Sequence, residues 1–206
     1  TIANNIRIGK LTISGDVATF AKAPHSNSTF SYWQQFAQTT IGEIRFLPAS
    51  LGISGAGVYT SYCNGPFKDS RVGKLNISEQ VEDIPAYCFK EMYLDQDVLV
   101  LHTKTIGNSA FQGANISIDT LAIGAELESF GYATSGSLNY FQQFGDMKIG
   151  KLKYCPKEAQ TGTACYKGVF ETAQIGALEI DSAVKQIPNY LFYNAKMELA
   201  DFTLNV

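Results

Sequence analysis

The two histidines are the first residues to weigh as catalytic groups. A Ser–His–Asp hydrolase needs a histidine base, and the chain offers only His25 and His102. His25 lies in the polar segment APHSNST, and His102 follows the apolar pattern VLVL at an outward-facing place. No GxSxG, HExxH or P-loop motif occurs, and no GxGxxG precedes an acidic residue. We therefore expect solvent-facing or hydrogen-bonding histidines, no bound cofactor and no enzyme activity.

The four cysteines could bind a metal or form disulfides. Cys63, Cys88, Cys155 and Cys165 show no CxxC spacing, so we expect no zinc site. Cys155 and Cys165 enclose a polar segment, CPKEAQTGTAC, which a disulfide would close. Two free thiols are the alternative, and a Cys63–Cys88 bond is favoured less.

Paired carboxylates are the remaining catalytic pattern. Glu179 and Asp181 are two residues apart on one expected strand face. Two acids on an exposed face are ordinarily only solvated. A glycan-active enzyme on a β-helix-like solenoid therefore stays a remote alternative.

Composition excludes several classes of partner. The chain has 206 residues, 45% of them hydrophobic and 17% charged, with a net charge of −3 and no basic run. This balance argues against nucleic-acid binding. No apolar stretch is long enough for a membrane helix, so we expect no membrane insertion. The first ten residues lack the features of a signal peptide, which favours a mature chain or a fragment of a longer one.

The elements that must position any functional group belong to an internal repeat. An apolar pair with one residue between its members occurs eight times: Leu11/Ile13, Ile44/Phe46, Leu75/Ile77, Leu99/Leu101, Leu121/Ile123, Leu152/Tyr154, Leu178/Ile180 and Phe202/Leu204. Three residues before the first member stands another apolar residue, except at Gln96, and glycine often follows it. The repeat units start near residues 8, 41, 72, 96, 118, 149, 175 and 199.

Each unit ends on an aromatic residue. The closing residues are Phe36, Phe67, Phe89, Phe111, Phe144, Phe170 and Phe192, always five or seven residues before the next unit start. Insertions must therefore fall between the strand and the closing Phe. They are longest in the units starting at 8, 41, 118 and 149, two of which contain the similar strings YWQQF (32–36) and YFQQF (140–144).

One unit shows how the repeat folds. Alternation places Leu75 and Ile77 on one face of a short strand and Asn76 on the other. Such a strand cannot bury its apolar face alone, so the units must stack as a parallel ladder. The closing Phe residues are expected in the core, and the recurring Gly and Pro in turns. We expect residues 1–206 to form a single solenoid.

The segments IGNSAF (106–111), IPAYCF (84–89) and IPNYLF (187–192) complete a recognisable pattern. With the strand spacing, it resembles the leucine-rich repeats of the BspA-like type over essentially the entire chain. The Asn of other leucine-rich repeats is replaced at Asp16, Gln80, Lys104, Glu126 and Ala183. The resemblance implies an α/β solenoid with a parallel strand ladder on the concave face and short turn or helical segments opposite. It also implies a bacterial surface or secreted protein that takes part in adhesion.

Two surfaces are candidates for binding a protein or glycan ligand. The outward row of the ladder, with one adjacent row, supplies Arg45, Asn76, His102, Lys153 and Glu179. The inserts supply Tyr32, Trp33 and Tyr140, whose side chains suit adaptable contacts. The alternatives are a merely solvated strand face and aromatic residues that only cover the flank. At the level of function, the alternative to a binding module is a structural spacer within a larger surface protein.

Overall fold

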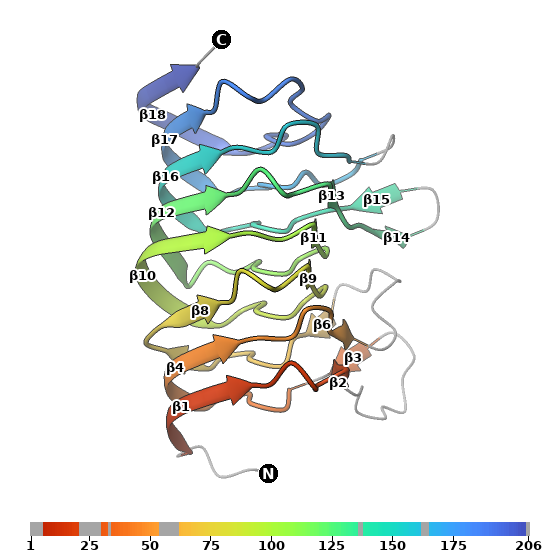
Figure 1. Ribbon diagram of the computed structural model, residues 1–206, viewed down its shortest axis with the longest axis vertical. Coiled ribbons are helices and arrows are strands. Elements are labelled where there is room, and N and C mark those ends of the chain that lie inside the picture. Colours follow the sequence, from red (N-terminus) through yellow and green to blue (C-terminus); the bar gives the residue numbers. More distant parts are fainter. Residues whose placement is uncertain are drawn as a thin grey trace.

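A computed structural model describes residues 6–20, 30–32, 34–53, 62–135, 138–161 and 165–204. These residues form a stack of coils that ascends from the N-terminus to the C-terminus, with a strand column along one side (Figure 1). No helix occurs in these ranges. The side opposite the column consists of turns and strands of two or three residues, so the expected helical segments are replaced there by turns.

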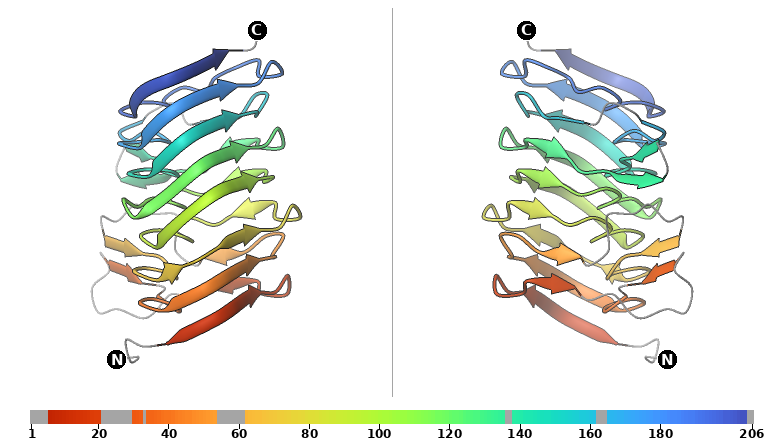
Figure 2. Two further views of the ribbon diagram at one scale, coloured as in Figure 1. Left: turned by 90° about the vertical axis from the view of Figure 1, so that its left-hand side faces the viewer. Right: turned by 90° about the vertical axis from the view of Figure 1, so that its right-hand side faces the viewer.

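The column is one parallel sheet of nine strands. Its strands are β1 (Arg7–Ile13), β4 (Thr40–Phe46), β7 (Arg71–Val72), β8 (Leu75–Ile77), β10 (Tyr93–Leu101), β12 (Ile116–Ile123), β16 (Lys148–Tyr154), β17 (Gln174–Ile180) and β18 (Lys196–Leu204). Neighbouring strands of the sheet follow each other in the chain. The one exception is that β7 and β8 both pair with β4, along different parts of that strand. Figures 1 and 2 show a nearly straight, twisted column, so the sheet is an open face and not the concave surface that we expected.

Each long strand bends in the middle. In β4 both Ile41 and Ile44 are buried although they are three residues apart, because Gly42 and Glu43 between them lie on the outer side. The bend brings neighbouring backbones close together. A Cβ on Gly42 would lie 2.5 Å from the carbonyl oxygen of Gly9. The recurring glycines after the first apolar residue therefore serve close strand packing, and the expectation that they form turns is wrong at these places.

The pairing of β17 with β18 contains one register shift of two residues. Ile175 pairs with Met197, whereas Ala177 lies opposite Asp201. The strand pairing therefore places Met197 opposite Ile175, two residues before the expected unit start at 199. The expected start at Gln96 pairs with the expected start at Ile118, although Val72 pairs with Leu94.

Short strands line the opposite side. The strands β9 (Asp83–Ile84), β11 (Thr105–Ile106) and β13 (Ser129–Phe130) form a small parallel sheet. The inserts contribute the pairs β2 (Thr19–Phe20) with β5 (Gly52–Ile53), β3 (Phe30–Tyr32) with β6 (Tyr62–Asn64), and β14 (Ala133–Ser135) with β15 (Leu138–Tyr140). Only the last pair is antiparallel, and it forms a hairpin that projects from the stack (Figure 1).

The closing Phe residues form one continuous aromatic stack. From Phe36 through Phe67, Phe89, Phe111, Phe144 and Phe170 to Phe192, successive ring centroids are 5.0 to 5.7 Å apart, with interplanar angles of 8 to 23°. Burying one such side chain contributes about 1.5–3 kcal/mol. This confirms the prediction that the recurring Phe residues belong to the core.

The turns that present these rings are linked by backbone hydrogen bonds. The amide of Phe89 donates to the Ala110 carbonyl, and that of Phe111 donates to the Gln143 carbonyl, each at 2.8 Å. Two residues before and after Phe89, Tyr87 and Glu91 adopt left-handed φ angles of 61° and 57°. The residues two before and two after Phe144 and Phe192 also have left-handed φ angles: Gln142, Asp146, Tyr190 and Asn194. The stack and the turns make consecutive units mutually dependent.

Candidate binding surfaces

The register of the sheet confirms the predicted outward row. Thr12 lies beside Arg45, and Arg45 beside Asn76. Further along the stack, successive register partners run through Val100, Ala122, Lys153, Glu179 and Thr203. The predicted row residues therefore line up along one face of the sheet, on strands that follow each other in the stack.

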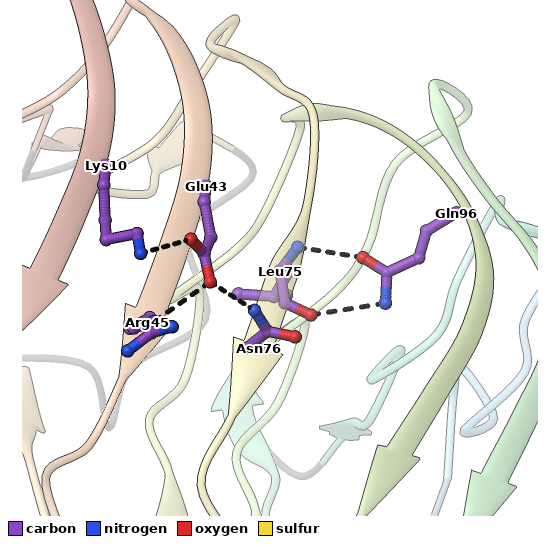
Figure 3. Close-up of polar contacts among 6 residues, drawn as sticks. All are labelled: Lys10, Glu43, Arg45, Leu75, Asn76 and Gln96. Carbon is purple, nitrogen blue, oxygen red and sulfur yellow. Dashed lines mark hydrogen bonds and ion pairs between the residues drawn. The ribbon is translucent and has the colours of Figure 1, made fainter.

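A polar network occupies the N-terminal part of this face (Figure 3). The carboxylate of Glu43 accepts hydrogen bonds from Arg45 Nε at 3.0 Å and from Asn76 Nδ2 at 2.7 Å, and it pairs with Lys10 Nζ at 3.1 Å. The hydrogen bonds from Arg45 and Lys10 lower the pKa of Glu43 to about 2. Arg45 and Asn76 are thus held together by a carboxylate between them.

A second ionic contact lies in the C-terminal part. Lys151 Nζ is 2.6 Å from Glu179 Oε2, and this contact lowers the pKa of Glu179 and raises that of Lys151. Lys153 is the register partner of Glu179. Asp181, the other acid of the predicted pair, accepts a hydrogen bond at 2.8 Å from the amide of Ala183 in the following turn. The two carboxylates therefore have separate partners.

Between these two parts the face contains two exposed valines. The side chains of Val98 and Val100 in β10 are 53% and 39% exposed, and their register partners in β12 are Thr120 and Ala122. Exposed valines at the centre of a charged sheet face form a patch that a partner can desolvate. The sequence pattern included Val100 in the row but gave no reason to single it out.

His102 lies apart from these groups. Its Nδ1 atom is 3.5 Å from Glu126 Oε2, and both side chains are partly exposed. The two residues lie just after β10 and β12, at the edge of the sheet. The structure does not bring His102 together with Arg45 or Glu179.

Gln96, the polar exception among the inward residues, joins β8 to β10. Its Oε1 atom accepts a hydrogen bond from the Leu75 amide at 2.8 Å, and its Nε2 atom donates to the Leu75 carbonyl at 3.2 Å (Figure 3). The strands β8 and β10 share no backbone register, so the side-chain amide replaces a strand residue in the ladder. The sequence flagged this position but gave no indication of its role.

Two shallow grooves cross the sheet where the strands bend. We define the C-terminal groove, of about 560 Å³, by Ser117, Asp119, Lys148, Ile149, Gly150, Gln174, Ile175, Gly176, Lys196 and Glu198. We define the N-terminal groove, of about 470 Å³, by Thr40, Ile41, Gly42, Arg71, Val72, Gly73, Tyr93, Leu94, Asp95 and Asn115. Sequence reasoning missed both grooves. The available signal was the Gly that follows the first apolar residue of a unit.

The insert tyrosines gather on the side opposite the sheet. The ring centroids of Tyr140 and Tyr166 are 5.3 Å apart. The ring of Tyr132 packs against buried Phe141, with a centroid distance of 5.7 Å. Tyr132 and Tyr166 are 50% and 53% exposed. We call Tyr132, Tyr140 and Tyr166 the tyrosine surface. Only Tyr140 was predicted.

The rest of the string YFQQF serves the core. Phe141, Gln142, Gln143 and Phe144 are all buried. The Nε2 atom of Gln143 donates to the carbonyls of Ile106, at 3.2 Å, and Gly131. Of the similar string YWQQF, Tyr32 lies in β3, but its side chain and the whole of Trp33 lie outside the described residues.

The suggested Cys155–Cys165 disulfide is absent from the structure, in which both thiols are free, as is buried Cys88. The two backbones are anchored separately: the Cys155 amide donates to the Ile123 carbonyl at 3.0 Å, and the Tyr166 amide after Cys165 donates to Asn139 at 2.8 Å. Burial raises the pKa of all three thiols, that of Cys165 to about 11. They are therefore mostly protonated and weakly nucleophilic at neutral pH.

The same described ranges bear on metal binding and membrane insertion. They contain no group of three or more His, Cys, Asp or Glu side chains placed to hold a metal ion. They also contain no helix that is long and apolar enough to span a membrane.

Comparison with known proteins identifies the repeat. A family model described as BspA type leucine rich repeat region matches residues 60–198 with six copies, which is more than half of the chain. No curated protein and no solved structure gives a significant match. The matched range contains most of the strand ladder and of the Phe stack. This chain belongs to the BspA-type leucine-rich repeat family.

Proposed function

We propose that this chain is a non-enzymatic binding or adhesion module of a bacterial cell-surface or secreted protein, and that it recognises a protein or glycan ligand. The observation that carries the proposal is the outward face of the sheet. Its side chains project in register from successive strands, and no other described part of the chain covers them. Repeat solenoids characteristically bind partners on extended faces built from successive repeats, and this face has the same periodic construction without the curvature.

The composition of the face supports recognition. Val98 and Val100 supply apolar area at its centre, and the Glu43 and Glu179 ion pairs lie on either side. The Phe stack fixes the strands that present them. A surface ordered before binding loses little conformational entropy when a ligand arrives.

Binding to immobilised glycans and matrix proteins tests the proposal. We expect a subset of the array to bind the wild-type chain, and Val98→Glu with Val100→Glu to abolish that binding, because the pair places two charges in the contact. Tyr132→Ser with Tyr166→Ser is the matched change on the tyrosine surface and should leave binding intact. Absence of any binding at high micromolar concentration would contradict the proposal, as would substrate turnover lost in folded His102→Ala or Glu179→Gln variants.

A spacer function is the second candidate. It is favoured by the unbroken stack of seven Phe rings, which makes a stiff rod of the repeats. A longer native chain in which this segment separates an anchor from a distinct functional domain, combined with an empty binding array, would support the spacer. Array binding that the valine substitutions abolish would exclude it as the whole function.

A further inference from the structure

We propose that the C-terminal groove is an oligosaccharide-binding subsite of the outward face. This inference rests on the proposed binding function and names both a location and a ligand class for it. It is carried by the way the groove is formed, by the unpaired state of its polar side chains, and by the kinds of contact that its walls can offer.

The groove is built into the packing of the sheet. A Cβ on Gly150 would lie 2.7 Å from the Asp119 carbonyl oxygen, and one on Gly176 would lie 2.9 Å from the Gly150 carbonyl oxygen. No side chain fits there without moving the backbone. The two neighbouring glycines therefore leave a permanent hollow with a floor of peptide backbone, bounded by Asp119 on one side and Glu198 on the other.

The polar side chains around this floor are uncommitted. Ser117, Lys148, Gln174 and Lys196 are successive register partners on β12, β16, β17 and β18. Within the described part of the chain, these four side chains and those of Asp119 and Glu198 make no hydrogen bond or ion pair with the protein. Lys151, only three residues from Lys148, is by contrast paired with Glu179. The groove thus collects donors and acceptors that the fold itself does not use.

The chemistry of the walls favours a hydroxyl-rich ligand over a peptide. A peptide that adds a strand needs free backbone groups, but β12, β16 and β17 are paired on both sides, and only β18 at the end of the sheet is paired on one side. A peptide that anchors by side chains needs an apolar pocket, but the two isoleucines that line the groove, Ile149 and Ile175, are each only 2% exposed. Lysine and amide donors beside carboxylate acceptors are instead suited to sugar hydroxyls, which both donate and accept hydrogen bonds.

The spacing of the groups suits an extended chain. Neighbouring strands lie about 4.8 Å apart, so Lys148 and Lys196 project from backbones about 10 Å apart, and Asp119 and Glu198 from backbones about 14 Å apart. A ligand that contacts all of them must lie across the strands, along the axis of the stack. A linear oligosaccharide fits this demand, whereas a single sugar reaches only one or two of the groups.

Calorimetric titration of the intact chain with defined tetrasaccharides tests the inference. The probes are tetrasaccharides of glucose, of N-acetylglucosamine and of galacturonic acid. We expect at least one to bind, and Lys148→Ala with Gln174→Ala to weaken it about tenfold or more, because two hydrogen-bonding groups are lost. The matched control is Lys74→Ala with Asp97→Ala, two exposed residues of the same face outside both grooves, which should leave affinity unchanged.

The outcomes separate this inference from the proposed function. Loss of binding in the groove variant alone, with unchanged thermal unfolding, supports the subsite. Retained tetrasaccharide binding in the groove variant, or equal loss in the control, overturns the subsite while the binding function stands. Absence of tetrasaccharide binding by a chain that does bind array proteins also overturns it. A chain that binds neither probes nor array contradicts the proposed function itself.

Discussion

The two grooves of the sheet share one architecture and differ in what their side chains do. Both have floors of stacked glycines, Gly42 with Gly73 and Gly150 with Gly176. In the N-terminal groove the guanidinium of Arg71 lies over the ring of Tyr93, 4.7 Å from its centroid. This places the only cation of that groove in a cation–π contact with the protein.

The same contrast extends to the strands around the grooves. Near the N-terminal groove, Glu43 has three polar partners, and Gln96 closes the gap between β8 and β10. Near the C-terminal groove, β12, β16 and β17 pair continuously, and no side chain is needed to complete the ladder. Polar side chains in the N-terminal half therefore stabilise the fold, while those of the C-terminal groove are left for a ligand.

Substitution of a core residue beneath the sheet should have the largest effect on stability. Leu121 is fully buried in β12, and Leu121→Asp should unfold the solenoid, with a loss of about 3–5 kcal/mol, because it buries an unpaired charge. Ala122→Asp, one residue further on the outward side, should cost less than about 1 kcal/mol. Urea unfolding followed by circular dichroism measures both. Equal losses would contradict the assignment of inward and outward faces.

Substitution of a glycine in a groove floor should have the next largest effect on stability. Gly42→Ala places a Cβ 2.5 Å from the Gly9 carbonyl oxygen, so we expect a loss of about 2–3 kcal/mol as the strands move apart. Gly9→Ala is the control, because an added Cβ there has no atom within 4 Å. The difference in thermal unfolding between the two variants is the measurement. If Gly42→Ala were as stable as Gly9→Ala, the close strand approach that forms the grooves would be refuted.

Gln96 tests whether the N-terminal half depends on side-chain polar groups. Gln96→Ala removes the partner of the Leu75 amide and carbonyl and should lower the free energy of unfolding by about 1–2 kcal/mol. Gln174→Ala in the C-terminal groove removes a side chain that has no polar partner among the described residues and should stay within about 0.5 kcal/mol. Hydrogen exchange of the Leu75 amide provides a local measurement. An unchanged exchange rate in Gln96→Ala would mean that β8 needs no such bridge.

The contrast between the halves also shows where sequence reasoning succeeds and fails. Apolar alternation predicts the ladder because burial decides which side of a strand faces inward, and Leu121 and Leu152 are register partners as expected. Glycine is ambiguous, since it serves turns through its φ angles and close packing through its missing Cβ. The recurring Gly42 was therefore assigned to the wrong role.

The site itself was harder to predict than the fold. Lys148 and Lys151 occupy one short string, KIGKL, and both are outward by pattern. Only the structure shows that Lys151 reaches diagonally from its register partner Ala177 to Glu179, while Lys148 lies beside Gln174 in the groove. The partners of a surface side chain depend on the neighbouring unit, which can be more than 30 residues away in the chain, as Asn76 is from Glu43. A pattern within one unit contains no such information.

The smallest predicted difference in stability concerns the ionised carboxylate of Glu43. Its pKa is about 2 in the folded chain, against an ordinary 4.5, because of Arg45 and Lys10. The ionised carboxylate therefore stabilises the folded state fully above about pH 4.5, and this contribution is lost as the pH falls toward about 2. Glu43→Gln should be less stable than the wild type at neutral pH, and the gap should close across this window, and also in concentrated salt.

The corresponding change in the C-terminal half is Glu179→Gln. Glu179 has a single ion-pair partner, Lys151, and its pKa is also lowered, so its gap should have the same sign and close on acidification as well. Because three groups surround Glu43 and only one pairs with Glu179, we expect the larger gap for Glu43→Gln. Urea unfolding of both variants over a pH series measures this. A gap for Glu179→Gln that equals or exceeds that of Glu43→Gln would show that the N-terminal network adds nothing beyond one ion pair, and the contrast between the two halves would then rest on Arg71 and Gln96 alone.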